Sequence, residues 1–77
     1  MPHVAVKLHA GRTDGEKQDL ADRITEAVKA ALGSSDESVS VSIEDVEPAD
    51  WMSQVYGPEI ESKPDTLFKK PGYGPLR

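Results

Sequence analysis

Two stretches of the chain, residues 3–9 and 38–46, alternate between apolar and polar positions. The apolar positions are mostly β-branched and share one face of each stretch: Val4, Val6 and Leu8 in the first, and Val39, Val41 and Ile43 in the second. A period of two with β-branched residues is typical of a half-buried strand. We therefore predict one strand over about 3–9 and another over about 38–46.

The segment between these stretches has the pattern of an amphipathic helix. Thr13 and Glu16 match a capping box, in which a hydroxyl and a carboxylate satisfy the first free backbone donors. Gly33 is a typical C-terminal stop. Apolar residues follow at helical spacing: Leu20, Ile24, Ala27, Val28, Ala31 and Leu32. The pattern predicts a helix over about 14–32.

A strand, a helix and a second strand in this order predict an α/β fold with one parallel, right-handed βαβ unit. Such a unit is incomplete by itself, because a two-stranded sheet is marginal in water and parallel sheets are normally covered on both faces. We expect two protomers to pair into a four-stranded sheet with two helices on one face.

The last third of the chain is less regular. Trp51, Met52, Val55 and Tyr56 are spaced like a short helix, which Gly57-Pro58 should break. Ile60, Leu67 and Phe68 suggest further helical turns, interrupted at Pro64, before a turn-rich tail. We predict a short helical C-terminal segment and one domain over 1–77.

Composition and charge exclude several classes of protein. The 77 residues include no cysteine, which excludes a disulfide framework, a Cys-based zinc site and thiol catalysis. A net charge of −5 argues against nucleic acid as a partner. Apolar runs fall short of the ~18 residues of a membrane helix, and the first residues lack a signal-peptide pattern. We expect a cytoplasmic protein with no membrane partner.

Pro2 is the most suggestive candidate for catalysis. An initiator Met is usually removed before a small residue, and this removal would turn a tertiary amide nitrogen into a secondary amine. An α-amino group titrates near 7.7–8.0, and burial or a nearby cation would lower that value. Pro2 could therefore be a neutral base at working pH, or simply a second residue that permits processing.

Pro2, the alternating strand, Gly11-Arg12, the capped helix, the second strand and Trp51 together resemble the 4-oxalocrotonate tautomerase superfamily. The opening Met1-Pro2-His3, the Trp51 segment and the closing residues 69–73 look most like its longer bacterial phenylenolpyruvate-type members. The resemblance covers essentially the whole chain. It implies a cofactor-independent, metal-free isomerase that interconverts enols and ketones of 2-oxo acids.

The resemblance also implies roles for individual residues. Pro2 would be the general base, and Arg12 would bind a substrate carboxylate or polarise the carbonyl, a task that suits a planar guanidinium. Ser40 stands where familiar members carry a second arginine, so a monocarboxylate with an apolar or aromatic end fits better than a dicarboxylate. Trp51 matches the aromatic residue that lines the family's pocket.

Two other functions remain open on the sequence. One is hydration or dehalogenation of an unsaturated acid, which needs a carboxylate to position water; Glu44 and Glu47 are the nearest in sequence. The other is a non-catalytic dimeric interaction module, in which Pro2 would have no chemical role. His3 and His9 lie about 20 Å apart along one strand and could not share a metal ion within one chain.

Two further expectations concern assembly and charge. The long C-terminal segment could cover the surface that other members use to form hexamers, so we expect a dimer. If Arg12 were not the cation of the site, Lys7, Lys69, Lys70 or Arg77 would be next in line, from the same or the neighbouring subunit.

Overall fold

The computed structural model describes residues 1–76, so Arg77 lies outside the described residues. The chain divides into two compact units, Met1–Val46 and Glu47–Arg77. Each unit is considered by itself below. The expectation of one domain over 1–77 stays a prediction.

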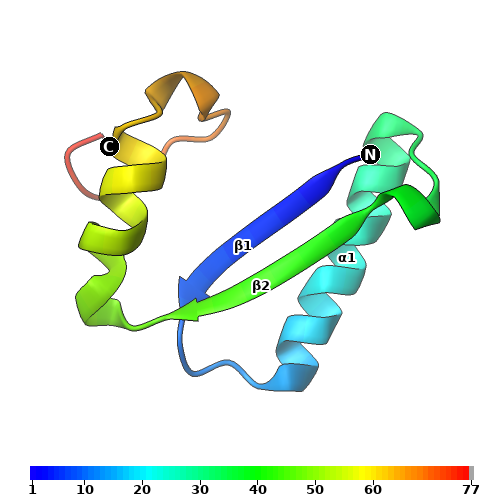
Figure 1. The fold of residues 1–77 in the computed structure, drawn as a ribbon, viewed down its shortest axis with the longest axis horizontal. Coiled ribbons are helices and arrows are strands. Elements are labelled where there is room, and N and C mark those ends of the chain that lie inside the picture. The colour runs from blue at the N-terminus through cyan, green and yellow to red at the C-terminus, as the bar shows by residue number, and fades with distance from the viewer. Residues whose placement is uncertain (77) are drawn as a thin grey trace. The chain divides into compact units, whose positions relative to one another are not determined.

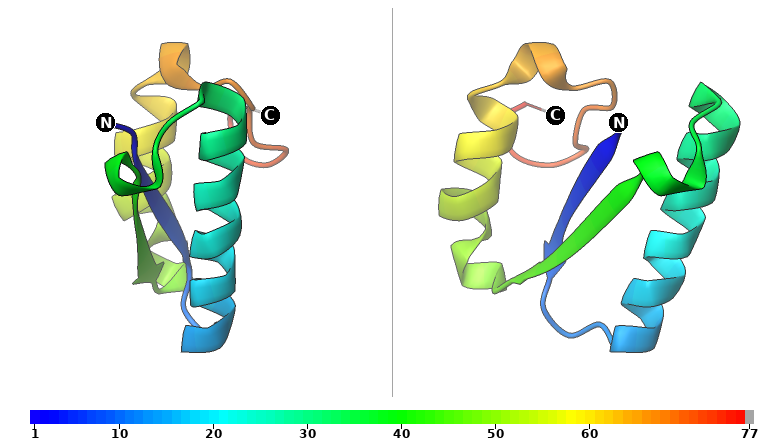
Figure 2. Two further views of the ribbon diagram at one scale, coloured as in Figure 1. Left: turned by 90° about the vertical axis from the view of Figure 1, so that its right-hand side faces the viewer. Right: turned by 45° about the vertical axis from the view of Figure 1, so that its right-hand side comes forward.

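The first unit is the predicted βαβ unit. It contains β1 (His3–His9), α1 (Asp14–Leu32), the short 3₁₀ turn η1 (Asp36–Ser38) and β2 (Ser40–Val46). Among the described residues the strands form a two-stranded parallel sheet, with a register running from His3 opposite Ser40 to His9 opposite Val46. The two strands lie side by side in Figure 1, and α1 packs against one face of the sheet in Figure 2. The fold class is confirmed.

The second strand begins two residues later than expected. Ser38 donates its hydroxyl to the carbonyl of Ser35 at 2.9 Å, and the Val39 N–H donates to the Asp36 carbonyl at 3.3 Å. These local bonds hold residues 36–38 in η1, because serine side chains readily offer the backbone an alternative to a sheet. The ladder therefore starts at Ser40.

Both ends of α1 are built as the sequence predicts. The Glu16 N–H donates to Thr13 Oγ1 at 3.1 Å, and the Thr13 N–H donates to Glu16 Oε1 at 3.0 Å, which completes the capping box. Gly33 adopts φ +68° and donates its N–H to the Lys29 carbonyl at 2.9 Å. Glycine takes this left-handed conformation without steric cost.

The apolar side of the first unit is only partly buried. Val4, Val6, Leu8, Val41 and Ile43 share the face toward α1 and are half-buried. Every side chain of α1 remains at least partly exposed, and Leu32 at its end is 68% exposed. The opposite face carries exposed His3, Ala5 and His9 of β1. A unit with so little buried surface is marginal by itself, which favours association.

The second unit consists of helical turns. It contains the 3₁₀ turn η2 (Pro48–Asp50), the π-helix η3 (Met52–Glu61) and the 3₁₀ turn η4 (Pro64–Thr66). The expected break at Gly57-Pro58 was wrong, since η3 continues through Pro58 to Glu61. The Ser62 N–H bonds to the Gly57 carbonyl, five residues back, at 3.0 Å. A π-helix has wider turns than an α-helix, in which proline clashes with the carbonyl four residues earlier.

The core of this unit is Tyr56, which is 1% exposed, beside buried Val55. The tail closes over Tyr56: the Leu76 N–H donates to the Tyr56 hydroxyl at 2.8 Å, and the Tyr73 ring lies 5.5 Å from the Tyr56 ring. The expected helical turns at Leu67 and Phe68 were wrong. Residue 68 lies beyond η4 and its side chain is fully exposed.

Gly74 gives a direct test of this packing. Its φ is +73°, and a Cβ there would lie 2.7 Å from the Tyr56 ring. Gly74→Ala is therefore expected to destabilise the second unit by about 2 kcal/mol, through backbone strain and overpacking. The measurement is urea unfolding followed by fluorescence of Trp51, the only tryptophan of the chain. Gly72→Ala is the control, because a Cβ there has no described atom within 4 Å and the midpoint should not move.

Candidate active site

Pro2 is held at the start of β1 by the neighbouring strand. The Ser40 N–H donates to the Pro2 carbonyl at 3.2 Å, which extends the ladder one residue beyond β1. Pro2 is half-buried, whereas Met1 before it is fully exposed. Removal of Met1 would therefore cost no packing and would leave the nitrogen of Pro2 on a backbone that is fixed by a hydrogen bond.

Ser40 does more at this end of the sheet than the sequence suggests. Its hydroxyl shares a hydrogen bond of 2.6 Å with His3 Nδ1, directly across the two strands. One residue thus contacts both Pro2, through its backbone, and His3, through its side chain. Ser40 thus lies beside the candidate base, and its hydroxyl already has His3 as a partner. His3, which was considered from the sequence only as a metal ligand with His9, joins this cluster.

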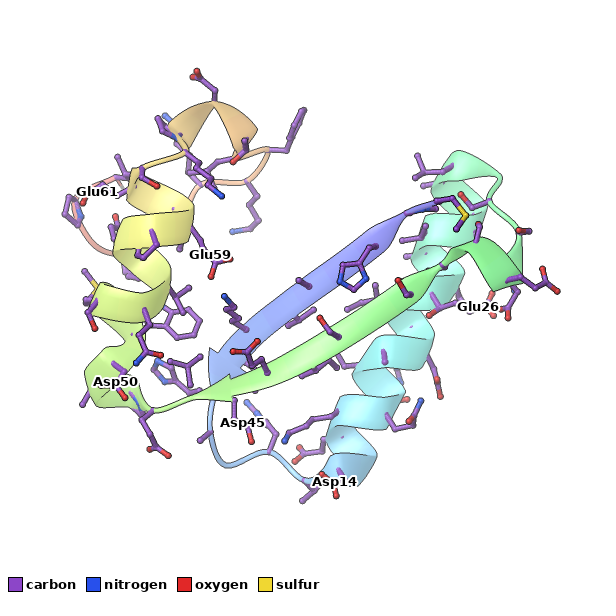
Figure 3. The ribbon with its side chains drawn as sticks, viewed as in Figure 1. Asp14, Glu26, Asp45, Asp50, Glu59 and Glu61 are labelled. Carbon is purple, nitrogen blue, oxygen red and sulfur yellow. The ribbon has the colours of Figure 1, made fainter. Side chains whose placement is uncertain are left out.

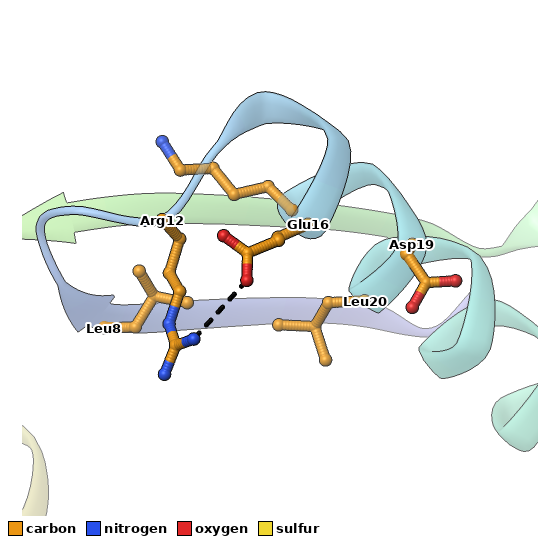
Figure 4. Close-up of a pocket in the computed structure, with 6 residues that line it drawn as sticks. Leu8, Arg12, Glu16, Asp19 and Leu20 are labelled. Atoms are coloured by element: carbon orange, nitrogen blue, oxygen red, sulfur yellow. Dashed lines mark hydrogen bonds and ion pairs between the residues drawn. The ribbon is translucent and has the colours of Figure 1, made fainter.

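Arg12 lies at the other end of β1, in the loop before α1. Its Nη1 lies 3.5 Å from Glu16 Oε2, and its side chain is 66% exposed. A cavity of about 410 Å³ opens here. Figure 4 shows this cavity, with Arg12 and Glu16 pointing toward each other and Leu8 and Leu20 beside them. The full lining is Leu8, Arg12, Glu16, Lys17, Asp19 and Leu20.

Hydrogen bonds fix the charges around this cavity. The backbone N–H of Thr13 lowers the pKa of the Glu16 carboxyl, and Arg12 lowers it further. The hydrogen bond from Lys17 Nζ to Asp45, at 2.8 Å, raises the pKa of the Lys17 ammonium. Asp45 lies at the carboxyl end of β2, near the start of α1 at Asp14 (Figure 3). The Glu16 carboxylate and the Lys17 ammonium therefore stay charged near neutral pH.

The structure does not bring Pro2 and Arg12 of one chain together. Pro2 precedes β1 and Arg12 follows it, and a strand of seven residues spans about 23 Å. A single substrate of ordinary size could not reach both groups within one protomer. If both act on the same molecule, they must come from different copies of the chain.

Trp51 belongs to the second unit, at the start of η3. Its indole Nε1 donates to the Tyr73 hydroxyl at 2.8 Å, and its side chain is half-buried. Tyr73 was missed as a functional candidate, because its contact with Trp51 joins residues 22 positions apart. The one signal in the sequence was its place in the closing segment that supported the resemblance.

The alternative cations and metal ligands are spread over the chain. Lys7 is half-buried within β1, and Lys69 and Lys70 are exposed in the tail; Arg77 lies outside the described residues.

His3 and His9 occupy the two ends of β1. Within residues 1–76, His, Asp and Glu form no group of three or more that could hold a metal ion. Over the same residues, helices long and apolar enough to cross a bilayer are absent.

The sequence matches the family described as "Tautomerase enzyme" over residues 2–59. A "Probable tautomerase" of Xylella fastidiosa is 50% identical over 76 residues, covering 99% of this chain and 93% of the relative. "Tautomerase PptA" of Cronobacter sakazakii is 42% identical over 74 residues, covering 95% of this chain and 97% of the relative. The chain therefore belongs to the tautomerase family, whose members are cofactor-independent isomerases.

Solved structures give the same fold. YwhB, a homologue of 4-oxalocrotonate tautomerase, aligns with a TM-score of 0.58 at 46% identity, covering 60% of this chain and 75% of that protein. TomN, a 4-oxalocrotonate tautomerase homologue in tomaymycin biosynthesis, aligns with a TM-score of 0.63 at 30% identity, covering 83% of this chain and 95% of that protein. Proteins of this family form homo-oligomers and act on small molecules.

Proposed function

We propose that the protein is a keto–enol tautomerase of 2-oxo acids in which the amine of Pro2, freed by removal of Met1, is the general base. The observation that carries this proposal is the hydrogen bond from the Ser40 N–H to the Pro2 carbonyl, at 3.2 Å. It fixes the backbone of Pro2 at the edge of the fold while Met1 extends fully exposed beyond it. A base whose backbone is held in one position is pre-organised for proton transfer.

The reaction needs only proton movement. The neutral amine of Pro2 takes the proton of the enol hydroxyl, the oxygen becomes a ketone, and the resulting ammonium returns the proton to carbon. The substrate gains and loses one proton and no electrons. Arg12 binds the carboxylate, and because β1 separates it from Pro2 of the same chain, we propose that the neighbouring subunit supplies it.

The proposed substrate is a phenylenolpyruvate-like monocarboxylate. Ser40 offers a hydroxyl but no charge for a second carboxylate, and its hydroxyl is bonded to His3. Leu8 and Leu20 in the cavity of Arg12 supply apolar surface for an aromatic or aliphatic end. In the second unit, Trp51 is held by Tyr73, so its ring could form a fixed apolar wall.

We propose a homodimer in the cytoplasm, in which both units form one functional domain. A sheet of two strands is marginal by itself, which favours pairing into a four-stranded sheet. The family match continues across the boundary between the units at residues 46 and 47. Static light scattering tests the assembly: a molar mass of two protomers is expected, and six protomers would contradict a dimer.

The function is tested by intact mass and turnover on the same sample. The mass should show loss of Met1, and the ultraviolet absorbance of phenylenolpyruvate should decay faster than in buffer alone. A processed, folded protein that leaves the enol at its uncatalysed rate would contradict the proposal. Turnover of an unsaturated or halogenated acid instead would indicate the hydratase or dehalogenase alternative.

A further inference from the structure

The partner of Arg12 is held more firmly than an ordinary surface carboxylate. Glu16 Oε1 accepts the Thr13 N–H at 3.0 Å, so that only Oε2 is directed at Arg12, 3.5 Å away. The Thr13 hydroxyl in turn accepts the Glu16 N–H at 3.1 Å. The capping box therefore sets the position of the Glu16 carboxylate, and the carboxylate faces the guanidinium that should receive the substrate.

The other charged side chains that line the cavity form ion pairs with residues other than Arg12. Lys17 is bonded to Asp45 at 2.8 Å, and Asp19 is bonded to Arg23 at 3.0 Å. The Asp19 carboxylate also points away from Arg12 in Figure 4. Glu16 is therefore the cavity's carboxylate that acts on Arg12, and it adds one fixed negative charge at the place where an anionic substrate must arrive.

We propose that Glu16 is a positioning residue for Arg12 and a determinant of substrate charge. It orients the guanidinium toward the cavity and reduces the local positive charge, so that one substrate carboxylate is accepted and a second is repelled. This inference rests on the proposed function for its substrate, but the pairing that it describes exists before any substrate binds.

The consequence differs between two kinds of substrate. A monocarboxylate needs only to share Arg12 with Glu16, whereas a dicarboxylate brings a second negative charge toward a fixed carboxylate. Like charges repel each other weakly in water and several-fold more strongly at the lower effective dielectric of a protein surface. The charge of Glu16 should therefore weaken dicarboxylates more than monocarboxylates.

Glu16→Gln tests this with little change in shape. The amide oxygen still accepts the Thr13 N–H, so the capping box remains, while the negative charge is lost. We measure kcat and KM for phenylenolpyruvate and for the enol of oxaloacetate, a dicarboxylate. The ratio of kcat/KM should shift toward the dicarboxylate by about three- to tenfold, mainly through KM. A purely structural role would change both substrates alike and leave the ratio unmoved.

Glu26→Gln is the matched control. Glu26 lies on the same helix, toward the end opposite Asp14 (Figure 3), and pairs with Lys29 at 3.5 Å, the same separation as the Arg12–Glu16 pair. The substitution Glu26→Gln removes the same charge from the protein, but at a site away from the cavity of Arg12. The ratio of kcat/KM between the two substrates should be the same in Glu26→Gln as in the wild type. An equal shift in both variants, or no shift in Glu16→Gln, would overturn the charge role.

A second readout needs no substrate. NMR of the arginine side chains measures how fast each guanidinium rotates, with Arg23 as an internal reference. Rotation at Arg12 should be slower in the wild type than in Glu16→Gln, and Arg23 should be unchanged. Equal rotation in both proteins would overturn the positioning role. If the wild type turns over neither enol but this difference is present, the proposed function fails while the positioning of Arg12 stands.

Discussion

Pro2→Ala should lower kcat by about a hundredfold, at the lower end of what a general base contributes, because a terminal amine remains. The new amine is primary, differs in basicity and lies on a backbone without the ring that fixes φ. KM should change little, since the base acts in the transition state more than in binding. The measurement is steady-state turnover of phenylenolpyruvate, with intact mass to verify that Met1 is removed from both proteins.

A blocked terminus separates the amine from the ring. One extra residue before Pro2 leaves the sequence intact but returns its nitrogen to a tertiary amide without a basic lone pair. This extended protein should lose more activity than Pro2→Ala, despite keeping the proline. Full activity in a protein whose mass proves the extension would exclude the amine as the base.

Arg12→Ala should lower kcat/KM by about one to two decades. The variant loses a charge-assisted hydrogen bond to the substrate, which is typically worth about 1.5–3 kcal/mol. The loss appears in KM if Arg12 only binds the carboxylate, and also in kcat if it polarises the carbonyl oxygen. Arg23→Ala is the control: Arg23 is 80% exposed on α1 and pairs with Asp19 at 3.0 Å, so its loss should leave turnover near that of the wild type.

A mixture of the Pro2→Ala and Arg12→Ala variants tests whether one active site contains residues of two chains. In a randomly mixed dimer, half of the molecules pair a Pro2 variant with an Arg12 variant, and each holds one intact site if the site spans subunits. About a quarter of wild-type activity should return. Pro2 and Arg12 acting within one chain would give no recovery. If Arg12→Ala leaves both constants unchanged on a folded protein, the cation comes from elsewhere, with Lys7, Lys69 or Lys70 next to be tested.

The βαβ unit could be predicted because its signals are local. The alternation in residues 3–9 and the capping box of Thr13 and Glu16 both act within a few residues, and the structure confirms them. The start of β2 was missed by two residues because hydrogen bonds in η1 compete with the sheet. The helix through Pro58 was missed because proline normally ends an α-helix, and the wider π-turn that accepts it has no simple sequence signal.

The sequence identified the residues of the candidate site but not the contacts between them. The position of Ser40 beside Pro2 follows from the register, which pairs His3 with Ser40 across 37 residues of sequence. The bond between Trp51 and Tyr73 likewise depends on how the tail folds over Tyr56. Such partners are set by tertiary packing, so a single sequence can nominate the residues without showing which atoms meet.

The central claim is that a neutral amine at Pro2 is the base, and pH tests it most directly. Below its pKa the amine holds a proton and cannot accept another, so kcat/KM should fall as the pH drops through that value. An ¹⁵N NMR titration of the Pro2 amine in the processed protein should give the same midpoint as the rate. A rate that stays flat down to pH 4, or a midpoint far from that of the amine, would contradict the account.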